Sequence, residues 1–133
     1  MSAHRISYAA SQRFTQLVQD QVARDPFLDD FQLFAPTLEG LKQAASKRAF
    51  PVDHRSVLVK ALRRQYEGLD ISGAVGENID RLARTDALTV TTGHQLCLFT
   101  GPMYVPLKLL NAIRLAGRLS QELQRPVVPV FWM

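Results

Sequence analysis

The segment that most restricts the fold is residues 86–133, in which a long amphipathic stretch separates two short apolar ones. Residues 88–92 are rich in β-branched side chains, which is typical of a strand. Residues 127–133 are almost continuously apolar, as expected for a strand that is covered on both faces of a parallel sheet. The stretch between them predicts a helix whose apolar stripe comprises Leu109, Ala112, Ile113, Ala116, Leu119 and Leu123. Strand, helix and strand in this order predict a right-handed βαβ unit, and therefore an α/β fold.

Residues 1–85 show a different pattern, in which helical periodicity recurs between short turns. Ser11, Thr37 and Asp53 stand where N-caps are expected, and a further helix is predicted over residues 73–84. We therefore expect a helical segment over residues 1–85 and the start of an α/β core over residues 86–133. Because a parallel sheet needs more than one strand pair to cover its faces, we expect the N-terminal part of a longer protein, with the sheet truncated.

Composition and charge exclude several classes of protein. The single cysteine excludes an internal disulfide, and three scattered histidines do not form a zinc framework, so no metal site is expected. The net charge of +4 is divided evenly between residues 1–85 and 86–133, so we expect no nucleic-acid partner and interpret the basic side chains as solvated. No apolar run approaches the roughly 20 residues of a membrane helix. No secretory signal opens the chain, so we expect no membrane contact and a cytoplasmic location.

Residues 93–101 are the strongest candidate for a functional site. Nine residues are many for a loop between a strand and a helix, where about two to six are usual. Gly93 and Gly101 permit close backbone approach, and Pro102 suits the first turn of the helix that follows. The start of that helix suits a phosphate or carboxylate, although the spacing matches neither common glycine-rich fingerprint. The apolar side chains within the loop predict that it is packed.

Single residues of this region each admit two interpretations. His94 and Gln95 either brace the loop through backbone hydrogen bonds or contact a ligand. Tyr104 and Lys108 are four residues apart and share a helix face, and Lys108 either reaches a phosphate or is an ordinary solvated lysine.

Four further side chains are given structural interpretations. Cys97 lies between two leucines without a flanking basic residue, so we expect a small buried side chain rather than a nucleophile. We interpret Thr91 as a strand residue, Trp132 as a core residue and His54 as a surface residue.

Two stretches, residues 90–104 and 125–133, closely resemble the bacillithiol biosynthesis cysteine-adding enzyme family of cysteine ligases. In that family a strand ends in a Thr-Gly-(Gln or His)-Gln turn, followed by a Leu-Phe-(Gly or Thr)-Gly-Pro segment and by a Tyr and a Lys on the next helix. The matching residues here are Thr92, Gly93, His94, Gln95, Leu98, Phe99, Thr100, Gly101, Pro102, Tyr104 and Lys108. The likeness spans nearly the whole chain and is specific over residues 88–133.

The resemblance implies a Rossmann-like core with helical insertions, similar to class I nucleotidyltransferases. It implies a ligase that joins cysteine to the amino group of glucosaminyl-malate, so these two small molecules are the expected partners. It makes His94 the candidate catalytic residue, as a donor or proton relay. It assigns substrate or nucleotide binding to Thr92, Gly93, Gln95, Thr100, Gly101, Tyr104 and Lys108. The residues specify no cofactor; because amide formation requires an activated carboxylate, ATP is the nucleotide that the chemistry suggests.

The sequence departs from the family pattern at its end, where an acidic-histidine segment and a later coiled-coil region are absent. We expect the full-length protein to be a homodimer. We expect this chain alone to be inactive and prone to aggregation, because its terminal strand is unpaired. Two alternatives stay open: a nucleotidyltransferase-like Rossmann domain that acts on another acceptor, and a non-enzymatic helical assembly module.

Overall fold

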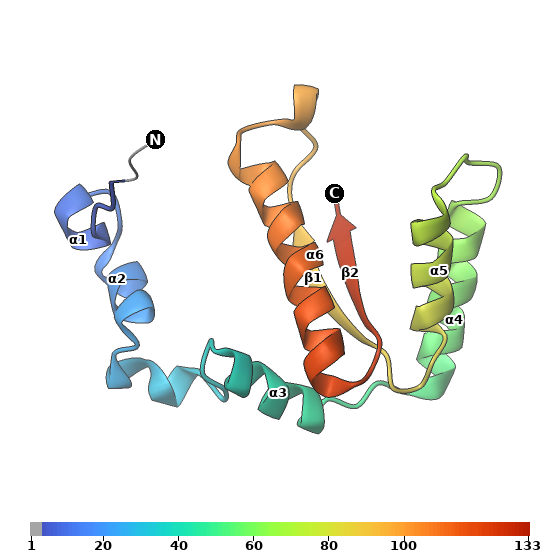
Figure 1. The fold of residues 1–133 in the computed structure, drawn as a ribbon, viewed down its shortest axis with the longest axis horizontal. Helices are drawn as coiled ribbons and strands as arrows, with labels where there is room; N and C mark the ends of the chain where they lie inside the picture. The colour runs from blue at the N-terminus through green and yellow to red at the C-terminus, as the bar shows by residue number, and fades with distance from the viewer. Residues whose placement is uncertain (1–3) are drawn as a thin grey trace. The chain divides into compact units, whose positions relative to one another are not determined.

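A computed structural model describes residues 4–133, except for the side chain of Thr100, and contains a parallel strand pair among helices (Figure 1). The α-helices are α1 (Tyr8–Ser11), α2 (Gln16–Ala23), α3 (Leu38–Lys47), α4 (Val52–Gln65), α5 (Gly73–Leu82) and α6 (Tyr104–Leu123). The short 3-10 helices are η1 (Pro26–Phe31) and η2 (Leu98–Thr100), and the strands are β1 (Leu88–Gly93) and β2 (Val127–Trp132).

The chain forms two compact units, of which the first ends at Gln43 and the second comprises Ala44–Met133. The second unit therefore holds α4 and α5 together with the strands and α6. The expected division into residues 1–85 and 86–133 stays a prediction about domains, because compactness alone does not define a domain.

In the first unit, the expected start of the second helix is wrong. Ser11 ends α1 instead of capping α2, because Gln12 takes a left-handed φ of 52° and stops the helix there. Ser7 is the residue that caps α1, accepting a hydrogen bond from the Ala10 N–H at 3.1 Å. Thr37 does cap the helix after it, accepting from the Gly40 N–H at 3.1 Å, as the sequence predicts.

In the second unit, α4 and α5 pack against β2 around a small apolar core. Val59, Ile79, Leu82 and Val128 form this core, with Leu62, Val75 and Val130 at its margin. Two residues apart on β2, Val128 and Val130 share one face of the strand. The expected cap of α4 is displaced: Pro51 takes the N-cap position and Asp53 lies in the first turn.

The predicted βαβ unit is confirmed. β1 and β2 are parallel neighbours, with a register that runs from Leu88 opposite Val127 to Gly93 opposite Trp132. α6 connects them and packs against both strands (Figure 1). The expected stripe is confirmed in most of its positions, because Ala112, Ala116 and Leu119 are buried and Leu109 and Leu123 are half-buried. The exception is Ile113, which is exposed, while Val105 is buried in addition.

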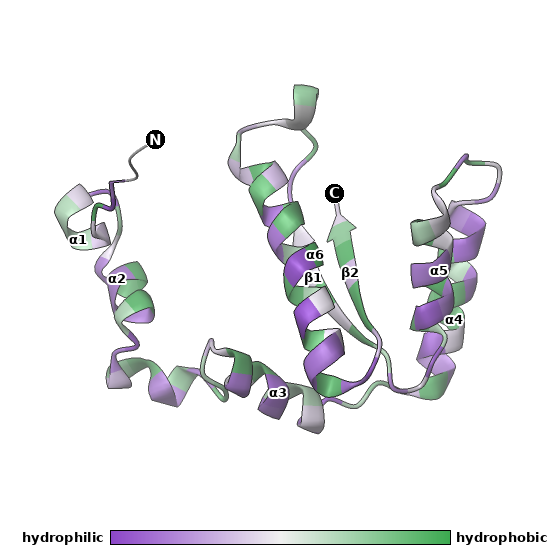
Figure 2. Ribbon diagram, viewed as in Figure 1, coloured by the Kyte–Doolittle hydropathy of each residue, from purple (hydrophilic) through white to green (hydrophobic). Residues whose placement is uncertain are grey.

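Burial of β2 decreases along its length, although most of the strand is hydrophobic (Figure 2). Val127 and Val128 point to opposite faces and are both buried, so the amino half of the strand is covered on both sides, as predicted. The carboxyl half is covered less, and the expectation that Trp132 is a core residue is wrong, because its side chain is 62% exposed. Within this unit, no described element covers the far end of the strand.

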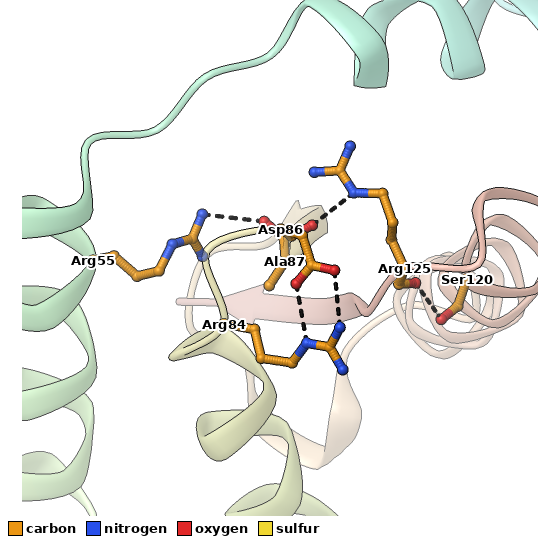
Figure 3. A network of polar contacts seen from close by, with 6 residues as sticks. All are labelled: Arg55, Arg84, Asp86, Ala87, Ser120 and Arg125. Atoms are coloured by element: carbon orange, nitrogen blue, oxygen red, sulfur yellow. Dashed lines mark hydrogen bonds and ion pairs between the residues drawn. The ribbon is translucent and has the colours of Figure 1, made fainter.

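A polar network fixes the amino ends of the strands (Figure 3). The buried guanidinium of Arg55 donates to the carbonyl oxygens of Leu82 at 3.0 Å and Ala87 at 3.2 Å. Its carbon Cζ also lies 5.2 Å from the centroid of the Phe50 ring, within the range of a cation–π contact. The expectation that the basic side chains are solvated is therefore wrong for Arg55, which is only 6% exposed.

The same network ties the segment before β1 to the segment before β2. Arg84 donates to both carboxylate oxygens of Asp86, at 3.0 and 2.9 Å, while Arg125 donates to the Asp86 carbonyl at 2.8 Å. Ser120, on α6, donates in turn to the Arg125 carbonyl at 2.7 Å. The hydrogen bonds from Arg84 hold the pKa of Asp86 below its ordinary value, and the charges of Arg84 and Arg125 act in the same direction.

Candidate functional site

The candidate site lies at the carboxyl edge of the strand pair, where open α/β sheets bind their ligands. β1 ends there at Gly93, β2 ends at Trp132, and α6 begins nearby at Tyr104 after the intervening loop (Figure 1). The His94 N–H donates to the carbonyl oxygen of Trp132 at 3.2 Å, which extends the strand pairing into the loop. The backbone of the loop therefore starts from a fixed position on the sheet.

Gly93 is required at the end of β1 by a close approach. A Cβ atom built on this residue would lie 2.4 Å from Cε2 of the Trp132 indole, well inside contact distance. The indole ring thus rests directly on the Gly93 backbone while most of its surface stays exposed. The glycine expected here for close backbone approach is confirmed, and the partner is an aromatic side chain.

The His94 ring is held by a hydrogen bond at each nitrogen. Nδ1 lies 2.7 Å from the carbonyl oxygen of Gln95, and Nε2 lies 2.5 Å from the hydroxyl oxygen of Tyr104. The His94 and Tyr104 rings meet edge to face, with centroids 5.3 Å apart and an interplanar angle of 64°. The bracing role predicted for His94 is thus present, and its partner comes from α6.

Lys108 joins this cluster from the second turn of α6. Its Nζ donates to the carbonyl oxygen of Gly93 at 2.5 Å and lies 5.8 Å from the centroid of the Tyr104 ring. The side chain is half-buried, so it is not the ordinary solvated lysine of one interpretation. The ammonium group puts a positive charge beside His94 and Tyr104, at the carboxyl edge of the strand pair. We call His94, Tyr104 and Lys108 the edge cluster.

The loop between Gly93 and Gly101 is exposed, and the expectation that it is packed is wrong. Leu96 and Leu98 are exposed, and Phe99 is 96% exposed. Phe99 also takes a left-handed φ of 50°, which is unusual for a bulky residue. Gly101 has a φ of 67°, and a Cβ there would lie 2.5 Å from Sγ of the half-buried Cys97. Gly101 therefore shows both the positive φ and the close approach for which the sequence predicts a glycine here.

The remaining predicted site residues are not part of the edge cluster. Thr92 is a half-buried residue of β1, and the side chain of Gln95 is exposed while its carbonyl serves His94. The side chain of Thr100 lies outside the described structure. The places of these residues do not test whether they bind substrate or nucleotide. Their assignment as binding residues therefore stays a prediction.

A second concave surface lies at the opposite, amino end of the strands. This cleft has a volume of about 470 Å³, and its lining includes Arg81, Arg84 and Arg125 as well as polar side chains of α6. Arg81 and Arg84 are paired with acidic groups, Glu77 and Asp86, at 3.3 and 2.9 Å. Arg125 donates to the Asp86 carbonyl, so all three guanidinium groups are engaged within the protein, which is the pattern of a structural network.

Neither a metal cluster nor a membrane span is found in residues 4–133. No three His, Cys, Asp or Glu side chains gather there in a way that could hold a metal ion. None of the helices in this part of the chain combines the length and the apolarity needed to cross a bilayer.

Comparison with known proteins agrees with the resemblance found in the sequence. Residues 1–133 match the family model described as "Bacillithiol biosynthesis BshC, N-terminal Rossmann-like domain". Three curated relatives carry the name "Putative cysteine ligase BshC". The protein from Cytophaga hutchinsonii is 41% identical over 133 residues, covering 99% of this chain and 26% of the relative. The protein from Flavobacterium johnsoniae is 37% identical over 131 residues, covering 96% of this chain and 25% of the relative.

The third relative, from Salinibacter ruber, is 34% identical over 137 residues, covering 99% of this chain and 24% of its own length. The chain thus spans about a quarter of the length of the curated relatives that it matches. The family match covers every residue, and the parallel βαβ unit fits a Rossmann-like fold. The chain belongs to the BshC family of bacillithiol biosynthesis, and it corresponds to the N-terminal Rossmann-like domain of that family.

Proposed function

We propose that this chain is the N-terminal part of a cysteine ligase that joins cysteine to the amino group of glucosaminyl-malate in bacillithiol biosynthesis. The names of the relatives support a cysteine ligase, and the family description supports the pathway. The observation that carries the proposal is the edge cluster, in which a histidine, a tyrosine and a lysine meet at the carboxyl edge of the strand pair.

The chemistry of amide formation makes two demands that such a cluster can meet. The attacking amine must lose a proton, and imidazole is the side chain whose ordinary pKa suits proton transfer near neutral pH. Negative charge on the carboxylate or on a phosphate must be held, and Lys108 together with the start of α6 offers positive charge there. α6 starts without a side-chain cap, but the Val105 N–H donates to the Pro102 carbonyl and Pro106 has no N–H, so the helix start contributes its partial positive charge rather than a set of free donors.

A nucleotide fits this arrangement as the group that activates the carboxylate. If ATP is used, Lys108 is the group of this chain that would hold its phosphates, with the positive end of the α6 dipole beside it. Bound ATP would supply the phosphoryl or nucleotidyl group that turns the carboxylate into an acyl donor. Cytoplasmic location, a homodimeric full-length protein and inactivity of this chain alone are parts of the same proposal.

The test is bacillithiol synthesis by the complete protein with single substitutions at the site. His94→Ala and Gln95→Ala are expected to abolish or strongly reduce formation of the cysteine adduct of glucosaminyl-malate, measured by mass spectrometry. His54→Ala is the matched control, because His54 is exposed on α4 and outside the edge cluster. Wild-type rates in both site variants would refute the site assignment.

A second measurement separates the ligase from the alternative enzyme. Exchange of labelled pyrophosphate into ATP that needs neither cysteine nor glucosaminyl-malate would favour a nucleotidyltransferase with another acceptor. Adduct formation that depends on both small molecules would support the ligase.

A further inference from the structure

The hydrogen bonds of His94 decide which of its nitrogens carries the proton. A backbone carbonyl can only accept, so the 2.7 Å contact between Nδ1 and the Gln95 oxygen requires the proton on Nδ1. In the neutral ring Nε2 is then the acceptor, and the Tyr104 hydroxyl at 2.5 Å must donate to it. Both nitrogens of the ring are therefore occupied by groups of the protein.

This arrangement leaves Tyr104 as the accessible member of the pair. The Tyr104 residue is 50% exposed, whereas His94 is half-buried. The ammonium of Lys108 lies on the Tyr104 ring and is itself anchored to the Gly93 carbonyl. A substrate that approaches the edge cluster can reach the hydroxyl oxygen of Tyr104, while the lone pair of His94 Nε2 already faces that hydroxyl.

We propose, resting on the proposed ligase function, that Tyr104 is the substrate-facing residue and that His94 acts through it. The protonated amino group of the acceptor gives a proton to the Tyr104 oxygen as the Tyr104 proton moves to His94 Nε2. One N–H bond of the substrate and the original O–H bond break, while a new O–H bond and an Nε2–H bond form. The amine becomes neutral and nucleophilic, His94 becomes imidazolium, and Tyr104 remains a neutral phenol.

Each side chain needs the other for this step. A phenol is a poor base at neutral pH unless another base removes its proton at the same time. Imidazole is a suitable base, but its free lone pair here points at Tyr104. The two side chains therefore act as a unit, and removing either one should remove the whole effect.

The first test compares Tyr104→Phe, His94→Ala and the double variant in the complete protein. We expect each single variant to lower kcat about 100-fold or more, with KM little changed, because general base catalysis contributes about 10²–10⁴. The double variant should be no slower than the slower single variant. Tyr66→Phe is the control, because Tyr66 lies just after α4 and outside the edge cluster.

Different failures have different meanings in this experiment. If Tyr104→Phe keeps the wild-type kcat while His94→Ala is inactive, His94 acts directly and the inference is overturned, while the proposed function survives. If Tyr104→Phe raises only KM, Tyr104 serves binding and the relay is wrong. If the wild-type protein forms no adduct, the proposed function itself fails, together with the substrate named for the relay.

The second test reads the tautomer without any activity. In histidine-labelled protein, long-range proton–nitrogen NMR should show the His94 proton on Nδ1, with the signal assigned by its loss in His94→Gln. Tyr104→Phe should release Nε2 and mix the two tautomers, whereas Tyr66→Phe should change nothing. A proton on Nε2 in the neutral wild-type ring would overturn the inference.

Discussion

The two ends of the same strand pair are built in opposite ways. At the amino end, Arg55 is buried and its guanidinium donates to two backbone carbonyls, and further arginines tie the segments before β1 and β2 together (Figure 3). At the carboxyl end, apolar side chains of the loop are exposed, and polar groups of the edge cluster face one another near the surface. At the first end the charged side chains tie backbone segments together, whereas at the second a lysine lies beside a histidine and a tyrosine.

This contrast shows why a residue's type does not reveal its role. Arg55 and Lys108 are both cations whose nitrogens bind backbone carbonyl oxygens, yet only Lys108 lies beside a histidine and a tyrosine. A substitution at the amino end should therefore cost folding free energy. A substitution at the carboxyl end should cost activity and little stability.

The largest stability effect is expected for Arg55→Ala. The change leaves the buried carbonyls of Leu82 and Ala87 without their donors and removes the contact with Phe50. We expect a loss of about 3 kcal/mol in the free energy of unfolding, because hydrogen bonds from a charged donor are worth about 1.5–3 kcal/mol each. Urea denaturation measures it, with the exposed Arg64→Ala as control, expected within about 0.5 kcal/mol of the wild type. Equal losses in the two variants would refute the contrast.

A smaller effect is expected for Gly93→Ala at the carboxyl end. The new methyl group must displace the Trp132 indole, which is exposed and can move. We expect a cost of about 1 kcal/mol, at the low end of overpacking, and a change in the fluorescence of the chain's single tryptophan. In a Trp132→Ala background the cost of Gly93→Ala should largely vanish. Full cost in that background would show that the indole is not the obstacle.

The ion pair at the amino end should appear in the pH dependence of stability. The folded pKa of Asp86 lies below the ordinary value near 3.8, so its stabilising contribution is present above that value and is lost as pH falls through the folded pKa. Asp86→Asn should therefore weaken the fall of the thermal midpoint below about pH 4. The exposed Asp70→Asn is the matched control. An unchanged acid profile in Asp86→Asn would contradict the assignment.

The smallest stability effect is expected for Phe99→Gly in the exposed loop. Relief of the left-handed backbone offsets the greater freedom of glycine in the unfolded chain. We expect the free energy of unfolding to stay within about 0.5 kcal/mol of the wild-type value. A loss above about 2 kcal/mol, measured by urea denaturation, would show that this end of the strand pair also carries stability.

The sequence by itself determined the strand–helix–strand order, the parallel strand pair and the place of the long loop that carries the candidate site. The β-branched composition before Gly93 and the apolar run after Pro126 indicate strands. The helical period of the amphipathic stretch between them indicates a helix. The sequence also predicted the need for glycine at positions 93 and 101, which the close approach of Trp132 and the positive φ of Gly101 explain.

Only the tertiary structure decided which side chains meet. Local sequence placed several helix starts a few residues away from where they lie, because a left-handed residue such as Gln12 ends a helix that periodicity would continue. It gave no sign that Arg55 is buried or that Tyr104 closes on His94, because these contacts join residues ten or more positions apart. It also predicted burial for Trp132 and for the loop from their hydrophobicity, whereas burial depends on whether another element covers them.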